Sequence, residues 1–351
     1  MILPGSPQPS LRLRIDSEAL AANWRTLDRL SGRARAGAAV KADGYGLGAG
    51  PVMTALIRAG ARDFFVAHWS EVPALLAQAS GAQIAVLHGP LLPADVAYAQ
   101  ATGVRPVINS LHQAALWLES GGGPCHLMVD TGINRLGLSP GELGDPLVGR
   151  LDVEVLLSHL ASADEDGPQN ARQLALFHET ARVCDARSLS LANSAGIALG
   201  PDYAFDLTRP GIALYGGVPR PELAGAVRQV VHLEAAVLQL RDLSPGDKVG
   251  YNAAFIAPRA MRAATISIGY ADGLLRSWSG NGTMVFAGQA LPLIGRVSMD
   301  MVMADASEVP ELRAGDFVTM PYALPEASHL SGLSQYELLT VLGNRFCRKE
   351  Y

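Results

Sequence analysis

Short apolar runs alternate with helical patterns from about residue 35 to about residue 216, and this alternation constrains the fold more than any other feature. The predicted strands lie at 35–42, 63–68, 83–89, 104–110, 125–130, 153–160, 189–194 and 211–216. Helical patterns lie between several of them, at 50–60, 70–80, 93–103, 110–120 and 170–184. Parallel strands need such crossover connections, so the pattern predicts an α/β fold in which eight strands close into a (β/α)8, TIM-like barrel.

The pattern of strand and helix signals changes at about residue 231. The stretch that follows is rich in strand and turn signals, such as "LSPGD" and "SGNGT", and has almost no helical period until a helix-like segment at 334–346. At 351 residues the chain exceeds the size at which a single core stops growing, about 250–300 residues. We therefore expect a barrel domain over 10–230 and a mainly β domain over 231–351.

Composition excludes several classes of protein. The net charge is −5 and no basic run is present, so the electrostatic footprint of a nucleic-acid-binding protein is missing. The three cysteines, Cys125, Cys184 and Cys347, are too far apart for a zinc site and too few for a disulfide framework. The opening "MILPGSPQPS" lacks the apolar core of a signal peptide, and no stretch reaches the length of a membrane span. We expect a cytoplasmic protein without a membrane or nucleic-acid partner.

One lysine stands out in "AVKADGYGLG", residues 39–48. The chain has 28 basic residues, yet its only lysines are Lys41, Lys248 and Lys349. Arginine stays protonated in proteins, whereas a lysine amine can lose its proton, act as a nucleophile and form a Schiff base with a carbonyl. The alternative is an ordinary lysine at the end of a strand.

Other reactive residue types also follow the predicted strands. In a barrel of this kind the chemistry lies at the carboxyl ends of the strands, where the connecting loops gather. The residues expected there are Lys41, Asp130, Arg135, His159, Asn193, Ser194, Arg209 and Gly211. They come from distant parts of the chain, and the barrel would bring them to one mouth.

Eight motifs, taken together, resemble those of the alanine racemases in order and spacing. They are "AVKADGYGLG", "VDTGINRLG", "SHLASADE", "ANSAG", "RPGIALYGG", "VGYNAAF", "ISIGYADG" and "GRVSMDM". The resemblance spans the chain after about residue 10. It implies a fold-type III pyridoxal-phosphate enzyme that interconverts L-alanine and D-alanine by a two-base mechanism, supplying D-alanine for peptidoglycan or serving alanine catabolism.

The resemblance also implies which residues hold the cofactor. Lys41 matches the lysine that binds pyridoxal phosphate as a Schiff base and then acts as the base on one face of the substrate. Arg209 matches the arginine that faces the pyridine nitrogen, and His159 matches the histidine that links it to a catalytic tyrosine. The matches to the phosphate site are Tyr45, Asn193, Ser194 and the backbone N–H groups of Gly211 and Ile212.

Racemisation needs a second base on the opposite face, and Tyr251 matches it. The unperturbed pKa of a tyrosine is about 10, so cationic neighbours must make this phenol more acidic. By resemblance, Tyr251 and Met299 reach the barrel of a second subunit, which implies a homodimer with shared sites. Met299 and Arg135 match residues that hold the substrate carboxylate, and the matches to the entrance are Tyr270 and Asp300.

One position departs from the family pattern. Many members have a lysine, often carbamylated, where this chain has Met128, so another group must orient Arg135. Alternatives to an alanine racemase are a racemase of broader specificity, a fold-type III decarboxylase, which would not need Tyr251, and a pyridoxal-phosphate carrier, which would lack residues 231–351. A metal-dependent hydrolase fits poorly because "SHLASADED" lacks paired histidine ligands, and no metal is expected.

Overall fold

The computed structural model describes residues 8–350. These residues divide into two compact units: residues 18–228 form one, and the described residues on either side form the other. Most of the opening "MILPGSPQPS", on which the expectation about export rests, lies outside the described residues. Within residues 8–350, no helix has the length and apolar character needed to cross a membrane.

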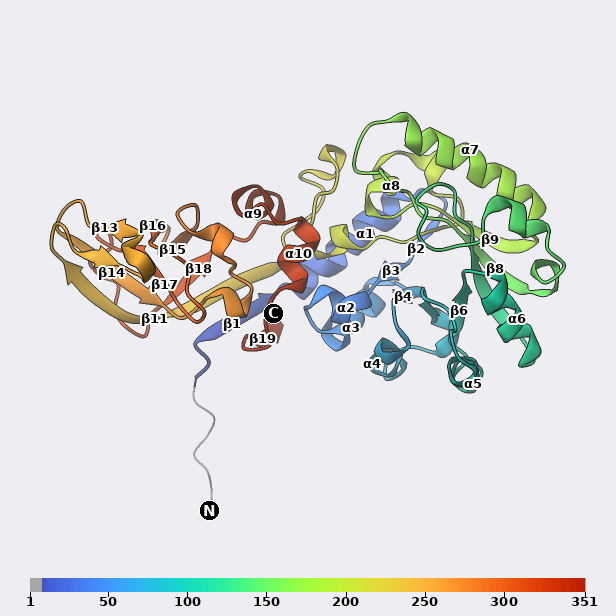
Figure 1. Cartoon of the computed structure of the whole chain (residues 1–351), viewed down its shortest axis with the longest axis horizontal. Coiled ribbons are helices and arrows are strands. Elements are labelled where there is room, and N and C mark those ends of the chain that lie inside the picture. Colours follow the sequence, from blue (N-terminus) through green and yellow to red (C-terminus); the bar gives the residue numbers. More distant parts are fainter. Residues whose placement is uncertain (1–7, 351) are drawn as a thin grey trace, which may run out of the picture. The chain divides into compact units, whose positions relative to one another are not determined.

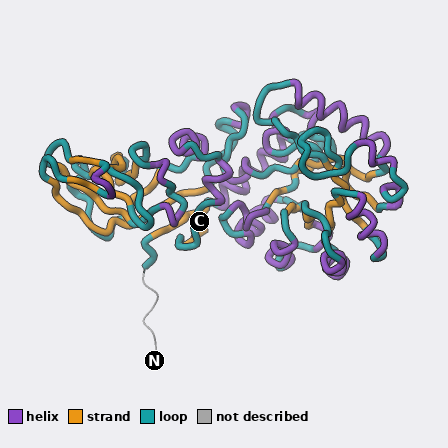
Figure 2. Tube along the Cα trace, in the orientation of Figure 1, coloured by secondary structure: helices purple, strands orange, loops and turns teal. Residues whose placement is uncertain are grey.

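Residues 18–228 fold into a barrel of parallel strands with helices around it (Figure 1). Seven strands pair in chain order, namely β3 (Ala38–Ala39), β4 (Phe64–Val66), β5 (Ile84–Val86), β6 (Arg105–Ile108), β7 (Pro124–Met128), β8 (Asp152–Leu157) and β9 (Ala186–Ser190). Helices lie outside the strands (Figure 2). The predicted α/β barrel architecture is confirmed.

The barrel closes through an eighth strand, β10 (Leu207–Thr208), which pairs in parallel with β2 (Arg35–Ala36). On one side the N–H of Ala39 donates to the carbonyl of Pro210 at 2.9 Å, and on the other the N–H of Arg209 donates to the carbonyl of Ala192 at 2.8 Å. The predicted eighth strand at 211–216 is wrong, because Ile212–Tyr215 forms a 3-10 turn. That stretch is fully buried, and a short buried apolar run does not by itself distinguish a strand from a helical turn.

Five helices of this unit lie where the helical patterns predict them, although the segment at 70–80 yields only a short helix; the predicted patterns did not include the helices at 17–30 and 194–198. Each covers the barrel with an apolar face; in α1, Leu20, Trp24 and Leu27 are buried at helical spacing. Their bounds are α1 (Ser17–Leu30), α3 (Ala49–Ala59), α4 (Val72–Leu76), α5 (Pro93–Thr102), α6 (Leu111–Glu119), α7 (Pro168–Val183) and α8 (Ser194–Ala198). A further short element, α2 (Lys41–Tyr45), belongs to the site described below.

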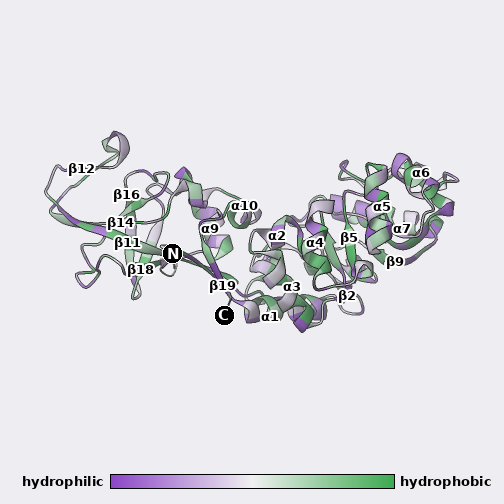
Figure 3. Cartoon of the chain, turned by 90° about the horizontal axis from the view of Figure 1, so that it is seen from below, coloured by the Kyte–Doolittle hydropathy of each residue, from purple (hydrophilic) through white to green (hydrophobic). Residues whose placement is uncertain are grey.

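Alternate residues of the strands point into the barrel or outward to the helices. Val155 and Leu157 join an interior apolar cluster with Met128, whereas Leu127 and Leu156 pack in a separate cluster with residues of the helices. Strands buried on both faces in this way are almost wholly apolar, as Figure 3 shows for β5. Met128 therefore lies in an apolar environment.

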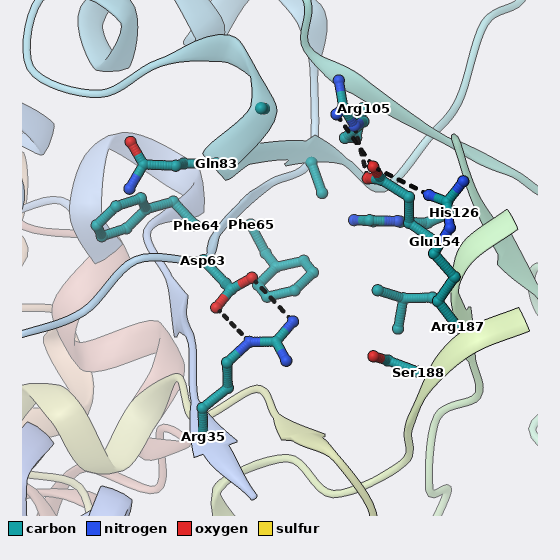
Figure 4. A pocket seen from close by; sticks show the side chains of 13 residues that line it. Arg35, Asp63, Phe64, Phe65, Gln83, Arg105, His126, Glu154, Arg187 and Ser188 are labelled. Atoms are coloured by element: carbon teal, nitrogen blue, oxygen red, sulfur yellow. Dashed lines mark hydrogen bonds and ion pairs between the residues drawn. The ribbon is translucent and has the colours of Figure 1, made fainter. Parts of the chain in front are cut away.

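Charged side chains line a small cavity of about 320 Å³ at the amino ends of the strands (Figure 4). Arg35 binds Asp63 with two hydrogen bonds of 2.9 and 3.3 Å, and Arg105 binds Glu154 with two of 2.6 and 3.1 Å. His126 lies beside them, and its Nδ1 is buried without a hydrogen-bond partner among the described residues. Because the reactive residues follow the strands at the opposite ends, this ionic layer serves stability.

The second unit is mainly β, as predicted. Its pairings close on themselves in the order β11 (Val231–Leu243), β14 (Met261–Ile266), β17 (Val302–Asp305), β16 (Gln289–Ile294), β15 (Thr283–Phe286) and β18 (Phe317–Met320), with β18 returning to β11. The long strand β11 pairs with β18 through residues 233–236 and with β14 from Val237 onward, and its register with β14 shifts between Val237 and Gln239. A small hairpin joins β12 (Lys248–Val249) to β13 (Phe255–Ile256).

The first described strand, β1 (Leu11–Ile15), also belongs to this unit. It pairs antiparallel with β11 and parallel with β19 (Cys347–Glu350), whereas the sequence analysis assigns residues from 10 onward to the barrel. Two helices complete the unit, α9 (Leu324–Ser331), which was not predicted, and α10 (Gln335–Thr340), which lies within the predicted segment 334–346.

Candidate active site

The predicted site residues of the barrel lie at the carboxyl ends of its strands. Lys41 follows β3, Arg135 follows β7, His159 follows β8, Ser194 follows β9 and Arg209 follows β10. Electrostatic effects connect several of them, since Lys41, Arg135 and Arg209 all act on the pKa of His159. The barrel thus brings together residues that are up to 168 positions apart in the chain, from 41 to 209.

Lys41 is a partly buried amine with an altered protonation equilibrium. Burial lowers its pKa below the ordinary lysine value of 10.5, the charge of Arg135 lowers it further, and the carboxylate of Glu71 opposes both. A lysine with a depressed pKa is more often neutral at physiological pH, and the neutral amine is the nucleophile.

A left-handed turn follows Lys41. Ala42, Asp43, Gly44 and Tyr45 have φ angles of 54°, 54°, 62° and 56°. This conformation costs roughly 1–2 kcal/mol for each non-glycine residue, so the surrounding structure must hold it in place. Within the turn, the N–H of Gly46 donates to the carbonyl of Ala42 at 2.8 Å, and the Asp43 carboxylate accepts the N–H of Ala49 at 2.7 Å.

Tyr45, at the end of this turn, lies against the segment that follows β10. It is 5% exposed and stacks on Tyr215 with the ring centroids 4.5 Å apart. Its hydroxyl oxygen lies 2.2 Å from the position that a β-carbon on residue 211 would occupy, so a larger residue there would have to displace Tyr45 or the backbone. Ser194 Oγ accepts the N–H groups of Gly211 at 2.8 Å and Ala213 at 3.2 Å, which leaves its own proton available to donate.

Two predicted phosphate ligands therefore have other partners in this structure. The N–H of Gly211 is bonded to Ser194, and the side chain of Asn193 caps α8 by accepting the N–H of Gly196 at 2.8 Å. Ile212 begins the 3-10 turn directly after Gly211. Asn193 therefore caps a helix, while Ser194 faces Gly211.

Arg209 is buried at 6% exposure. Its guanidinium donates to the Ser190 hydroxyl and to the carbonyl of Ser158, and among the described residues no carboxylate pairs with it. Burial lowers its pKa to about 10, which is still high enough to keep the positive charge at neutral pH. Burial also lowers the pKa of His159 to about 3, with a further contribution from Arg209, so this imidazole is neutral at pH 7.

Several residues that connect the loops of the site were not predicted from the sequence. Gln173 of α7 is fully buried; its Nε2 donates to Thr131 Oγ1 at 3.2 Å and to the carbonyl of His159 at 3.0 Å, while its Oε1 accepts the N–H of Ala161 at 2.8 Å. The sequence offers one indication of this role, a glutamine at a buried position of a helix. The rest could not be predicted because the hydrogen-bond partners of Gln173 lie on two other loops.

Asp130 organises the loop that carries Arg135. Its carboxylate accepts the N–H groups of Gly132, Ile133 and Arg135 at 2.7, 3.0 and 2.9 Å. Burial opposes the charged form of Asp130, but these hydrogen bonds outweigh it and hold the pKa below the ordinary value. The "DTGINR" motif is thus a turn built around one carboxylate.

The remaining predicted residues belong to the other unit. Tyr251 is 64% exposed and Met299 is 52% exposed, and both line a pocket of about 810 Å³ together with Asp300. Asp300 also accepts a 2.7 Å hydrogen bond from Arg345. Tyr270 lies outside the pocket lining, but its N–H donates to the carbonyl of Ser298 at 3.0 Å.

Arg345 is a further residue that sequence reasoning missed in this unit. It clamps the fully buried Asp272 with two hydrogen bonds of 2.7 and 2.8 Å, in addition to its bond to Asp300. The hydrogen bonds that the guanidinium donates to these carboxylates raise its pKa, so it stays charged. The motifs that contain Asp272 and Asp300 are therefore joined by an arginine from the C-terminal part of the chain.

Comparisons with known proteins agree with this arrangement. The model of the alanine racemase N-terminal domain matches residues 15–219, and the model of the C-terminal domain matches residues 230–350. The alanine racemase of Methylobacterium nodulans is 43% identical over 96% of this chain and 95% of its own length. The biosynthetic alanine racemase of Agrobacterium fabrum is 41% identical over 97% of this chain and 94% of its own length.

A solved structure extends the likeness to three dimensions. The crystal structure of the alanine racemase from Bartonella henselae, which has covalently bound pyridoxal phosphate, superposes with a TM-score of 0.90 at 36% identity. The match covers 98% of this chain and 100% of that one. By both family models and by identity over nearly its whole length, the chain belongs to the alanine racemase family.

Proposed function

We propose that the protein is a pyridoxal-phosphate-dependent alanine racemase, an isomerase that interconverts L-alanine and D-alanine. The observation that carries the proposal is the position of Lys41, a lysine of lowered pKa at the start of the turn that ends at Tyr45, whose hydroxyl lies against Gly211. Curated relatives at 41–43% identity over nearly the full chain have this activity in their names.

The residues at the mouth of the barrel fit pyridoxal phosphate. Lys41 would hold the cofactor covalently, and Tyr45 with the Ser194 hydroxyl would donate to its phosphate beside Gly211, where a β-carbon would collide with Tyr45. Arg209, buried and without a carboxylate partner among the described residues, would face the ring nitrogen. When bound, the cofactor supplies an electron-withdrawing ring that makes the Cα proton of an amino acid acidic.

The chain's own groups would then move that proton. The Lys41 amine is the base on one face of Cα, and Tyr251 is the base on the other, so that removal on one side and delivery on the other inverts the centre. Arg209, which keeps its positive charge, would act through the neutral His159 to stabilise the phenolate of Tyr251, because a tyrosine side chain, whose ordinary pKa is about 10, needs nearby positive charge to ionise. Arg135 and the N–H of Met299 would hold the substrate carboxylate, with Tyr270 and Asp300 at the entrance.

We further propose a homodimer in which residues 231–351 of one subunit supply Tyr251 and Met299 to the barrel of the other. The exposure of both side chains and the pocket that they share support a surface that receives a partner. The amino acid substrate would then lie between groups from two chains.

Isotope exchange tests the reaction. We expect NMR of the cofactor-loaded protein with L-alanine in D2O to show deuterium entering Cα as D-alanine forms. Lys41→Ala should abolish both, and Tyr251→Phe should impair both severely. If the loaded wild-type protein exchanges no proton, it is not an alanine racemase; serine, lysine and ornithine then test for a racemase of broader specificity, and carbon dioxide release tests for a decarboxylase.

Complementation tests the shared site. In a hybrid of one Lys41→Ala chain and one Tyr251→Phe chain, one of the two sites regains both bases if the sites are shared. Random pairing of the two coexpressed inactive variants should therefore restore about a quarter of the wild-type activity. No recovery despite formation of the hybrid would show that both bases come from one chain.

The environment of Met128 supports a distinct proposal for Arg135. Met128 packs among apolar side chains of the barrel interior and cannot be carbamylated. We propose that Arg135 is oriented by the Asp130 loop and by a bound anion, so that turnover depends on chloride or bicarbonate. Turnover that is indifferent to both anions would contradict this.

We also propose that the enzyme works in the cytoplasm. All three cysteines, Cys125, Cys184 and Cys347, are free thiols, as is usual in a reducing compartment. Cell fractionation with an antibody against the protein tests this location.

A further inference from the structure

The carboxylate of Glu71 joins two loops at the mouth of the barrel. Its Oε2 accepts the N–H groups of Ala67 at 2.8 Å and His68 at 2.9 Å, in the loop after β4. Its Oε1 accepts the N–H of Ala42, in the loop after β3. One side chain therefore bonds to three backbone groups, and Glu71 itself is only partly exposed.

The hydrogen bond between Glu71 and Ala42 lies at the start of the turn that follows Lys41. Ala42 is the first residue of the left-handed turn and directly follows Lys41. The hydrogen bonds within the turn begin at the N–H of Gly44, which donates to the carbonyl of Val40 at 2.9 Å, and the Asp43 carboxylate secures the far end at Ala49. At the start of the turn, the N–H of Ala42 donates to Glu71, which lies 29 positions later in the chain.

The charge of Glu71 also acts on Lys41. The charges of Glu71 and Arg135 act on the pKa of this amine, and the charge of the amine acts on the pKa of His88 and His159. Glu71 is the one that favours the protonated amine, while Arg135 and burial disfavour it. Geometry and charge therefore both connect Glu71 with the reactive amine.

We propose that Glu71 is a positioning residue for the racemase reaction: by holding the N–H of Ala42, it fixes the Lys41–Tyr45 turn and so directs the Lys41 amine and the Tyr45 hydroxyl. This inference rests on the proposed function. The competing explanation is that Glu71 merely caps the short turn Trp69–Glu71 through His68.

The chain offers a matched control for the capping role. Glu142 accepts the N–H of Ser139 at 2.7 Å across the same three-residue spacing, at the start of the turn Pro140–Gly144, and has no role in the site. Glu71→Gln and Glu142→Gln remove the same charge from the same local motif. Only Glu71→Gln removes the charge-assisted bond to Ala42.

The test compares the two variants as loaded enzymes. In Glu71→Gln we expect amide hydrogen exchange over residues 42–46 to accelerate about tenfold or more, the loss expected for one charge-assisted hydrogen bond. Cofactor retention during dialysis and kcat should fall by a similar factor, while KM for alanine stays within about twofold because the hydrogen bonds of Glu71 go to Ala42, Ala67 and His68 and not to Arg135. Glu142→Gln should match the wild-type protein in all of these.

Two outcomes would overturn the inference. Exchange over 42–46 at the wild-type rate in Glu71→Gln would show that the turn does not depend on Glu71. Faster exchange confined to residues 68–72, with unchanged cofactor retention, would leave only the capping role. Failure of the proposed function is distinguishable, because the wild-type protein itself would then neither retain the cofactor nor exchange the Cα proton.

Discussion

The hydroxyl oxygen of Tyr45 lies 2.2 Å from the position of a β-carbon on residue 211, and that residue is glycine. The two residues are 166 positions apart in the chain. Tyr45 ends the left-handed turn that begins after Lys41, and Gly211 begins the segment that binds Ser194. Their close approach joins the first and the last strand of the barrel at the proposed phosphate site.

We expect Gly211→Ala to weaken cofactor binding. The added methyl group must displace either Tyr45 or the backbone, at a cost of about 1–3 kcal/mol, which corresponds to roughly a 5- to 150-fold loss of affinity. Equilibrium dialysis with absorbance detection of pyridoxal phosphate measures this. Gly141→Ala is the control because nothing lies within 4 Å of its β-carbon. A Gly211→Ala variant with unchanged affinity would show that the close approach of Tyr45 and Gly211 does not contribute to cofactor binding.

Lys41 should react with acylating reagents at lower pH than an ordinary lysine. Burial and Arg135 lower its pKa, so a larger fraction of the amine is neutral near pH 7 to 8. Acetic anhydride applied to the protein stripped of cofactor, with mass spectrometry of the three lysine peptides, measures the pH midpoint. The exposed Lys248 is the internal reference. Pyridoxal phosphate should protect Lys41 but not Lys248; equal midpoints or equal protection would refute the assignment.

Gln173→Leu should destabilise the protein and loosen His159. The substitution removes three hydrogen bonds from a fully buried site and leaves their partners unsatisfied, which should lower the free energy of unfolding by about 2–4 kcal/mol. Urea unfolding checks the stability, and kcat at a temperature where the variant stays folded checks the site. Thr180→Val on the same helix removes one local bond, from Thr180 Oγ1 to the Phe177 carbonyl, and should leave kcat unchanged. A Gln173→Leu variant with normal kcat would separate Gln173 from the function of His159.

Acid should destabilise the barrel through His126. Burial lowers the pKa of this histidine from 6.5 to about 4. Between these values the unfolded chain binds a proton that the folded chain does not, so stability present above pH 6.5 is lost as the pH falls to about 4, by on the order of 3 kcal/mol. The free energy of unfolding, measured from pH 7 to 4, should fall less steeply in His126→Gln. Parallel curves for the two proteins would exclude this histidine as the cause.

Much of the fold follows from the sequence alone. Seven of the predicted strands contain the observed ones at least in part, because period and apolar character are local properties of a segment. The sequence also predicts which residues react, from the lysine before the glycine-rich turn and from the ordered motifs that resemble those of the alanine racemases. The roles of these residues stay predictions until the exchange and complementation experiments are done.

The tertiary structure decided what local pattern could not. The eighth strand lies at 207–208 instead of 211–216, and β1 pairs with β11 rather than with the barrel, because pairing depends on which edge the closed sheet presents. Glu71 and Gln173 were found only through their hydrogen bonds to distant loops of the barrel, and Arg345 only through its bond to Asp300 within the other unit. The sequence determined which segments form strands and helices and which groups can react; closure of the barrel decided which of them meet, because hydrogen-bond partners far apart in the chain have no local signature.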